Sequence, residues 1–365
     1  MKFFILSDAH LGKYGMDSDK WLNNMRSYFF DFFIPILEEN VKPNDKFFFL
    51  GDLFDNRNSI DMRAITLGVE IFEAISKIIE CHVLLGNHDQ RMMTDPTINS
   101  VVSIRNINNV TVYDKETIIN IDDHKILMMP WVHGKDTEKN ILDKYSGCDL
   151  LMCHSDLNGC RTQLYPTRPL SKSILDIEDF SGYDKVYSGH IHIVQEIQNF
   201  TFVGSPYHLD RNDVSNRKGI YVYNTKTRKD IFIENDFSPE FIKIHINEEK
   251  DLLILKDRVK ENNFIDIYIS NNLILNKPHV KLELDKIVNK HKVENIFFLD
   301  DIEKTETEKK VNNIQTKSIK EISYDWSDQI KYNDDLDMFT EIELKNKLKQ
   351  TIEECFNLHQ TTNKK

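Results

Sequence analysis

Short apolar runs recur along the first two thirds of the chain, and amphipathic helical patterns separate them. Runs of this length that lie between turn residues are typical of buried β-strands. The predicted strands are Lys2–Ser7, Lys46–Leu50, His82–Leu85, Lys125–Met129, Leu150–Cys153, Lys185–Tyr187 and Thr201–Val203.

Two helical patterns separate the first three predicted strands. In the first, apolar residues recur at helical spacing from Leu22 to Ile36. Pro35 is expected to kink or end this helix, because proline lacks a backbone N–H. The second pattern runs from Met62 to Ile79. The alternation of strands and helices predicts an α/β domain over residues 1–235, with helices packed on sheets.

The pattern changes near Asp236 and predicts a separate small α/β domain over residues 238–301. Phe241–Ile246 and Phe264–Ile269 alternate apolar and polar residues, as half-exposed strands do. Leu252–Lys260 and Val280–Lys292 have helical patterns, and Asn295–Leu299 is expected to be a closing strand.

Residues 302–320 are polar and without periodicity, which predicts a flexible linker. In the segment 321–365, Thr340 and Glu343 match a capping box at the start of a helix. Because a short amphipathic helix cannot bury its apolar face alone, we expect it to pack on its own domain or on a partner. That face comprises Leu344, Leu348, Ile352, Cys355 and Phe356.

The composition of the 365 residues, 40% hydrophobic and 29% charged, is typical of a soluble globular protein. No apolar run approaches the ~20 residues that cross a membrane, and the N-terminus has no small-residue cleavage site, so neither a membrane span nor a signal peptide is expected. The five cysteines are odd in number and show no CxxC spacing. They predict a reducing, cytoplasmic setting, with neither a disulfide framework nor a zinc–thiolate site.

The net charge of −12 is unusual for a protein that binds nucleic acid. It argues against tight independent binding to DNA, but not against chemistry on a phosphate ester. Divalent ions would add positive charge where a phosphate docks, and basic loops or a partner protein could supply the rest.

Polar clusters follow most of the predicted strands of the first domain. Ligands of open α/β sheets bind at the carboxyl ends of the strands, so we expect these clusters to converge on one cleft. The five clusters are Asp8-Ala9-His10, Gly51-Asp52-Leu53-Phe54-Asp55, Gly86-Asn87-His88-Asp89, Cys153-His154-Ser155 and Gly189-His190-Ile191-His192.

The residue types in these clusters predict a metal centre with oxygen and imidazole ligands and no thiolate. Such a set suits Mn²⁺, Fe²⁺ or Zn²⁺ better than Mg²⁺. Seven ligands are too many for one tetrahedral ion, but they suit two ions about 3.5–4 Å apart that share a carboxylate. Glycines before three of the ligands would let the backbone close on the site. The predicted ligands are Asp8, His10, Asp52, Asn87, His154, His190 and His192.

Each cluster also has a simpler explanation when it is taken alone. Asp8 and His10 could form a turn with a helix cap, and Gly51-Asp52 is a common turn pair. His190 and His192 could be solvent-facing histidines. The five clusters in this order, each at a strand end, favour the metal centre.

With these five motifs in this order, residues 1–235 resemble the calcineurin-like metallophosphoesterase superfamily. Within it, the chain is most similar to the SbcD-type nucleases, including the nuclease subunits of T-even phage recombination endonucleases. Leu11-Gly12, Pro130-Trp131 and Gly204-Ser205-Pro206 support this resemblance. It implies a four-layer αββα sandwich, a small α/β capping domain for DNA and a C-terminal helical segment that binds a partner ATPase.

The resemblance also implies roles for individual residues. One ion falls to Asp8, His10, Asp52 and His192, and the other to Asp52, Asn87, His154 and His190, with Asp52 as the bridge. His88 resembles the catalytic histidine of the family, next to the scissile phosphate. Asp55 stands where many cellular relatives have histidine. Manganese is the expected metal, and magnesium is the alternative.

The expected reaction is attack of a metal-activated water on phosphorus, with His88 stabilising charge or protonating the leaving oxygen. Asp89 could orient the His88 ring or cap a following helix. Basic residues after the fourth motif and after Gly204-Ser205-Pro206 could contact DNA phosphates or form a solvated surface. They are Arg161, Arg168, Lys172, Arg211, Arg217 and Lys218.

The function predicted from the resemblance is a two-metal-ion DNA nuclease with 3′-to-5′ exonuclease and endonuclease activity. The chain has no GxxxxGK[ST] loop, so the ATPase would be an SbcC-like coiled-coil subunit bound by the C-terminal helix. A homodimer within a heterotetramer is the implied assembly. The alternatives are a protein or small-molecule phosphatase and a non-catalytic scaffold subunit.

Overall fold

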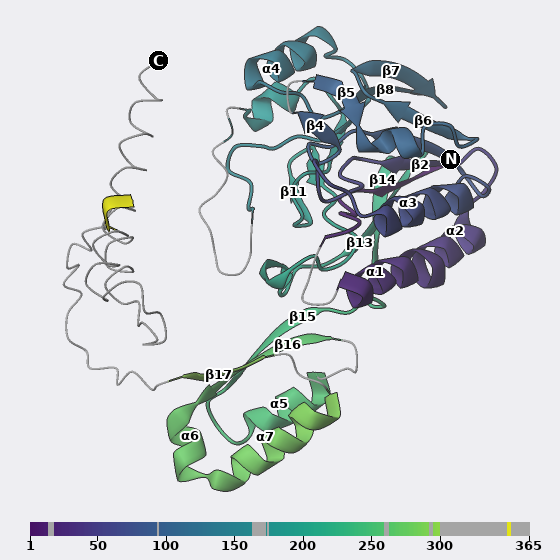
Figure 1. The fold of residues 1–365 in the computed structure, drawn as a ribbon. Helices are drawn as coiled ribbons and strands as arrows, with labels where there is room; N and C mark the ends of the chain where they lie inside the picture. Colours follow the sequence, from purple (N-terminus) through teal and green to yellow (C-terminus); the bar gives the residue numbers. More distant parts are fainter. Residues whose placement is uncertain are drawn as a thin grey trace. The chain divides into compact units, whose positions relative to one another are not determined.

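Two sheets of mixed strand direction form the core of residues 1–235 in this computed structural model (Figure 1). It describes residues 1–13, 18–92, 95–162, 173, 175–258, 263–291, 295–299 and 349–351. Residues 1–301 form one compact unit and residues 302–365 another. The linker predicted at 302–320 lies outside the described residues, and so does the helical segment predicted at 321–365, apart from residues 349–351.

Four neighbouring strands of the first sheet are parallel to one another. A hairpin of two further strands extends the sheet at one end, and its first strand runs antiparallel to the parallel set. The strand order of the sheet is β14 (Lys229–Glu234), β13 (Gly219–Asn224), β1 (Lys2–Leu6), β2 (Lys46–Phe49), β3 (Glu80–Leu84) and β6 (Val110–Tyr113).

The second sheet also has four parallel strands, with an antiparallel strand at each edge. Its order is β11 (Gln195–Ile197), β12 (Phe200–Phe202), β10 (Lys185–Ser188), β9 (Leu150–Cys153), β8 (His124–Met129) and β7 (Thr117–Ile121).

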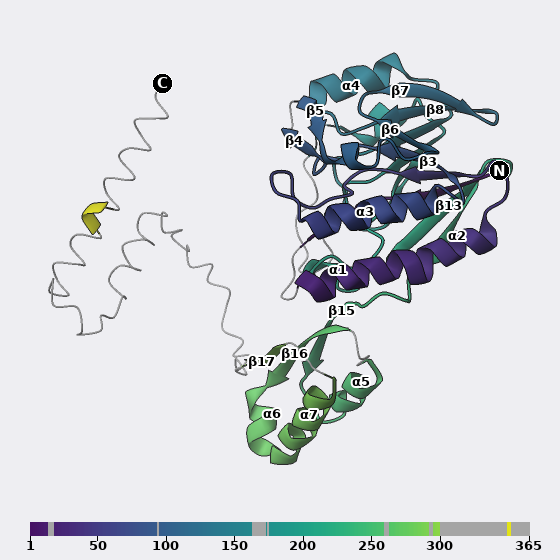
Figure 2. The ribbon, with the colours of Figure 1, turned by 45° about the vertical axis from the view of Figure 1, so that its right-hand side comes forward.

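Alternating side chains of β1 show how the layers are held together. Phe4 and Leu6 belong to the cluster that the helices α1 (Ser18–Ser27), α2 (Ile34–Asn40) and α3 (Met62–Ile75) cover. Phe3 and Ile5 pack between the two sheets, against side chains such as Met128 and Tyr187. The helix α4 (Lys135–Lys144) covers the outer face of the second sheet (Figure 2). The result is the expected four-layer αββα sandwich, in which the central strands of each sheet are buried on both faces.

The expected end or kink at Pro35 takes the form of a π-helical segment, and the helix does not stop there. Residues Tyr28–Phe33 form this segment between α1 and α2, and the backbone N–H of Ile34 donates to the carbonyl of Phe29, five residues earlier. Pro35 then lies in the first turn of α2, where its missing N–H is tolerated.

Two short strands follow the third polar cluster, β4 (Gln90–Met92) and β5 (Asp95–Asn99), where the sequence pattern predicted none. Short 3₁₀ turns at Ser100–Ser103, Ile177–Phe180 and Arg211–Asp213 complete the loops. In the described part of the chain, no helix has the length and apolar content that would cross a membrane.

The small α/β region has its own core. Its parallel sheet has the order β15 (Phe241–Ile246), β16 (Phe264–Ser270) and β17 (Asn295–Leu299). The helices α5 (Asp251–Arg258), α6 (Asn271–Asn276) and α7 (Pro278–His291) pack on it through side chains such as Leu255 and Leu284. The prediction that Phe264–Ile269 is half-exposed was wrong, because β16 is the central strand and is buried at every position except Tyr268.

Candidate metal centre

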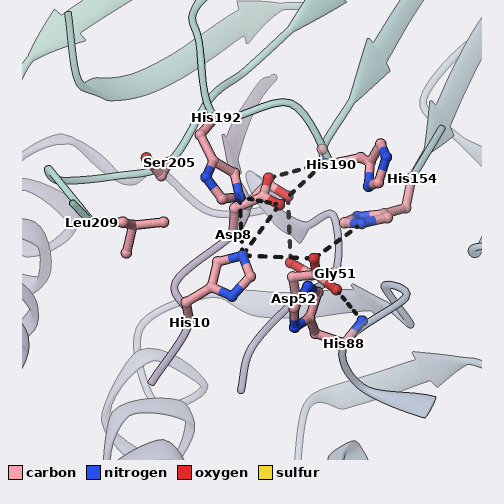
Figure 3. A network of polar contacts seen from close by, with 12 residues as sticks. Asp8, His10, Gly51, Asp52, His88, His154, His190, His192, Ser205 and Leu209 are labelled. Carbon is pink, nitrogen blue, oxygen red and sulfur yellow. Dashed lines mark hydrogen bonds and ion pairs between the residues drawn. The ribbon is translucent and has the colours of Figure 1, made fainter. Parts of the chain in front are cut away.

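The carboxyl ends of strands from both sheets bring all seven predicted ligands to one place. Figure 3 labels six of them, all except Asn87. β1, β2 and β3 of the first sheet are followed by the first three polar clusters, and β9 and β10 of the second sheet by the last two. Parallel strands all point their carboxyl ends to one edge, and the two stacked sheets present these edges to each other.

Asp8, His10 and His192 form the first group of ligand atoms. The Nε2 atoms of the two imidazoles are 3.1 Å apart. The Asp8 Oδ1 atom lies 3.9 Å from Nε2 of His10 and 3.8 Å from Nε2 of His192. The three atoms therefore surround a space of the size that a divalent ion needs.

Asp52, Asn87, His154 and His190 form the second group. The Asn87 Oδ1 atom is 3.0 Å from Nε2 of His154 and 2.9 Å from Nδ1 of His190. The Asp52 Oδ2 atom is 3.3 Å from Nε2 of His154 and 3.6 Å from Nε2 of His10. Asp52 therefore faces both groups, as a bridging carboxylate must.

The hydrogen-bonding chemistry of the second group fits a cation. Nδ1 of His154 is 2.7 Å from the Leu50 carbonyl, which can only accept, so Nδ1 carries a hydrogen and Nε2 is the nitrogen that faces the oxygens of Asn87 and Asp52. When no metal is bound, the raised pKa of the ring favours a proton on Nε2, which can donate to these oxygens. Without that proton or a cation, the Asn87 carboxamide would be better satisfied with its oxygen and nitrogen exchanged. A divalent ion among these atoms can take the place of the proton.

The ionisable ligands perturb one another strongly. Burial raises the pKa of Asp8. Burial would also raise the pKa of Asp52, but the charge of His154 holds it well below its usual range. Burial alone would lower the pKa of His154, whereas the carboxylates of Asp52 and Asp8 raise it to about 9. Protons therefore occupy part of this site when it holds no metal, and metal binding displaces them.

The backbone around the ligands adopts conformations that few residues tolerate. Asp8, His10, Asp52 and His190 have positive φ angles of 54°, 44°, 56° and 77°. Such strain is rare outside glycine and clusters at functional sites. The glycine prediction is confirmed with a difference: a Cβ on Gly86 would lie 2.1 Å from Oδ1 of Asp52, so this glycine permits close approach, not a left-handed turn.

His88 and Asp55 lie beside the first group. Nδ1 of His88 donates to the Asp55 carbonyl at 2.6 Å, and its ring centroid is 4.8 Å from that of His10. The Asp55 carboxylate accepts a hydrogen bond of 3.0 Å from Nδ1 of His10. Asp55 therefore orients both rings, a role that the sequence analysis did not assign to it.

Neither role expected for Asp89 fits its contacts. The His88 ring is oriented by the Asp55 carbonyl, and the element after Asp89 is a strand, so there is no helix to cap. The Asp89 carboxylate is buried and accepts four backbone hydrogen bonds of 2.8–3.3 Å. The donors are the N–H groups of Asp52, Leu53, Phe54 and Gly86. Asp89 thus fastens the second cluster to the third.

A model of calcineurin-like phosphoesterases matches residues 1–194. The chain belongs to this family. Calcineurin-like phosphoesterases use divalent metals, so the chain is a metal-dependent phosphoesterase, and the two groups of ligand atoms are where its metal would bind.

Two further comparisons give the relatives of this phosphoesterase. Exonuclease subunit 1 of Enterobacteria phage T4 is 26% identical over 327 residues, which cover 84% of this chain and 89% of the T4 protein. A solved structure described as that of a novel archaeal phosphodiesterase is 15% identical, with a TM-score of 0.35, and the match covers 64% of this chain and 99% of that one.

Of the six basic residues predicted to contact substrate, the four that the structure describes are either exposed or paired with groups of the protein. Arg161 is exposed, and Arg168 and Lys172 lie outside the described residues. Arg211 pairs with Asp266 of β16 through two hydrogen bonds, and Arg217 pairs with Glu234. The sixth, Lys218, is buried and its ammonium is bound by protein oxygens, which does not favour contact with substrate.

One cation that the sequence analysis missed does lie at the centre. Nη2 of Arg57 is 2.9 Å from Nδ2 of Asn87, on the side of the carboxamide away from the ligand group; both atoms are donors, so Arg57 makes no hydrogen bond to Asn87 while Oδ1 faces the ligands. Arg57 lies two residues after Asp55, in the loop that β2 delivers. Its place directly after the second motif is the signal that could have identified it.

Proposed function

We propose that this phosphoesterase is a DNA nuclease that uses two metal ions. The observation that carries the proposal is the extent of the similarity to T4 exonuclease subunit 1. It spans 327 residues, whereas the family model ends at residue 194, so the similarity includes the small α/β region as well as the catalytic motifs. Sequence similarity confined to the metal-binding motifs would be equally consistent with a phosphatase.

In this proposal one ion is held by Asp8, His10, Asp52 and His192, and the other by Asp52, Asn87, His154 and His190. Manganese is the metal we expect, because the ligands mix imidazole with oxygen. Bound ions of this kind lower the pKa of water and polarise the phosphate. His88, held through Nδ1, presents Nε2 to the leaving or non-bridging oxygen. Arg57 neutralises phosphate charge at the edge of the centre.

The substrate we propose is DNA, cleaved from duplex ends in the 3′-to-5′ direction and within single strands. The net charge of −12 supports the need for a partner that brings DNA to the site. We propose an SbcC-like coiled-coil ATPase, bound by the segment 321–365, in a heterotetramer that contains two copies of this chain. The T4 relative is itself named as a subunit. We propose that the chain acts in phage DNA replication, repair or recombination in the host cytoplasm.

The test compares three substrates at equal metal concentration: duplex DNA labelled at either end, bis(para-nitrophenyl) phosphate, and para-nitrophenyl phosphate. We expect Mn²⁺-dependent cleavage of DNA and of the diester, loss of both with EDTA, and little turnover of the monoester. Faster turnover of the monoester than of either diester would make the chain a phosphatase. No turnover of any substrate, with both metals bound, would support the scaffold alternative.

The partner is tested by truncation. Deletion of residues 321–365 should leave Mn²⁺-dependent cleavage of the diester intact and abolish co-purification with the ATPase subunit. Co-purification that survives the deletion would place the contact elsewhere on the chain.

A further inference from the structure

Lys218 is a buried lysine whose ammonium has three protein acceptors. Its relative exposure is 3%. Nζ donates to the carbonyl of His192 at 2.9 Å, to the hydroxyl of Ser205 at 2.6 Å and to the carboxylate of Asp213 at 2.6 Å. An ammonium has three hydrogens, so these contacts use all of them.

Asp213 supplies the opposite charge and is buried as well. Its Oδ1 atom also accepts from the side chain of Asn216 at 2.9 Å, and its Oδ2 atom accepts from the backbone N–H of Leu209 at 2.7 Å. The carboxylate is therefore fixed by the loop that follows Ser205, and the ammonium cannot shift without breaking several hydrogen bonds.

The ion pair lies where the two sheets meet. Lys218 directly precedes β13, which pairs with β1, the strand that ends next to Asp8. His192 comes from the other sheet, after β10. Lys218 therefore connects a ligand delivered by the second sheet to the sheet that delivers Asp8 and His10.

Stability alone does not explain such a pair. Replacing a buried ion pair by apolar side chains of similar volume is often neutral or stabilising, because desolvation of the two charges offsets their attraction. One of the three acceptors of Lys218, however, is the backbone carbonyl of a predicted metal ligand. Groups that hold a ligand in place affect metal affinity by about 10- to 100-fold.

We propose that Lys218, fixed by Asp213, is the positioning residue of His192, and that it sets the affinity of the ion held with Asp8 and His10. The inference rests on the two-ion assignment proposed above. Loss of the ammonium frees the His192 carbonyl but leaves the ligands of the other ion, Asn87, His154 and His190, in their places.

The experiment measures Mn²⁺ binding to metal-free full-length protein by calorimetry, with the EPR spectrum as a second reading of the paired ions. The variants are Lys218→Met and the double variant Lys218→Met/Asp213→Asn, which leaves no unpaired buried charge and carries the test if the single variant does not fold. Lys185→Met is the control. This substitution breaks a partly buried ion pair between Lys185 and Asp230. Lys185 begins β10, whereas His192 follows the end of that strand.

We expect two Mn²⁺ equivalents for the parent protein. In the double variant one of them should weaken by about 10- to 100-fold, and the EPR signal of the coupled pair should be lost. Lys185→Met should lower the melting temperature and change neither equivalent. A parent protein that binds fewer than two ions would overturn the two-ion assignment itself. A parent that binds two, with a folded double variant that binds both unchanged or weakens both equally, would overturn the role of Lys218 alone.

Discussion

The Asp55 carboxylate accepts a 3.0 Å hydrogen bond from Nδ1 of His10, which leaves Nε2 of that ring to face the other ligands. The same residue accepts from His88 through its backbone carbonyl. One side chain and its own peptide group thus orient a metal ligand and the proposed catalytic histidine.

Asp55→Asn should weaken metal binding, because an amide is a poorer acceptor for the His10 ring than a carboxylate. We expect one Mn²⁺ equivalent to bind about 10- to 100-fold more weakly. Calorimetry on the metal-free protein measures this. Asp114→Asn, which removes an exposed partner of Arg105, is the matched control and should leave both equivalents unchanged. Unaltered binding to the Asp55 variant would show that the contact does not orient His10.

His88→Ala should abolish turnover and spare the metals. Loss of a general acid or a charge-stabilising group lowers the rate by about 10²- to 10⁴-fold. Metal analysis of the purified variant should give the parent stoichiometry, because His88 is not among the seven ligands. A variant that has lost its metals would instead make His88 a ligand.

Asp89→Ala should unfold more easily than the parent. The change leaves backbone N–H groups of Asp52, Leu53 and Gly86 without their acceptor in a buried place, and each unsatisfied donor costs about 1–3 kcal/mol. Urea denaturation should show a loss of at least about 3 kcal/mol. A variant with parental stability and reduced turnover would contradict this structural role and indicate that Asp89 takes part directly in catalysis.

Arg57→Ala should raise KM for the diester with little change in metal content. A hydrogen bond between a guanidinium and a phosphate contributes about 1.5–3 kcal/mol, so KM should rise about 10- to 100-fold. Arg63→Ala is the control. Arg63 lies at the start of α3, where it pairs with Asp61 and with Asp19 of α1. Equal effects of the two substitutions would indicate a general effect of charge and no specific contact.

The free energy of unfolding should fall as the pH drops from about 6.5 to 4, in part because of His82. Burial lowers the pKa of His82 to about 4, so below 6.5 the unfolded chain binds a proton that the folded protein excludes. The stabilisation is present above 6.5 and is lost as the pH falls towards 4, by up to about 3 kcal/mol for this histidine. Urea denaturation at pH 7 and 4.5 should show a smaller loss for His82→Phe. His279→Phe, an exposed substitution, should retain the full loss.

The sequence predicted the centre better than it predicted the residues around the centre. Asp52 and His154 are far apart in the chain, yet each lies within three residues of the end of an apolar run that could be recognised as a buried strand. The carboxyl ends of parallel strands lie at one edge, so local patterns were enough to bring such residues together. The strands β13 and β14 at one end of the first sheet were missed. The polar residues Asn224, Lys229 and Asp230 lie at or near the turn between them, and only the pairing of β13 with β1 and of β14 with β13 fixes their place in the sheet.

The sequence by itself therefore determined the fold class and the set of candidate ligands, because both depend on local periodicity and on residue type. Tertiary structure alone decided what Asp89, Lys218 and Arg211 contact. The sequence places each of these charged residues next to a motif, where a role in catalysis or in substrate binding is the natural expectation. Their hydrogen-bond partners come from other loops and strands, and a charge that is buried or paired by distant groups cannot be distinguished from a free one by its neighbours in the chain.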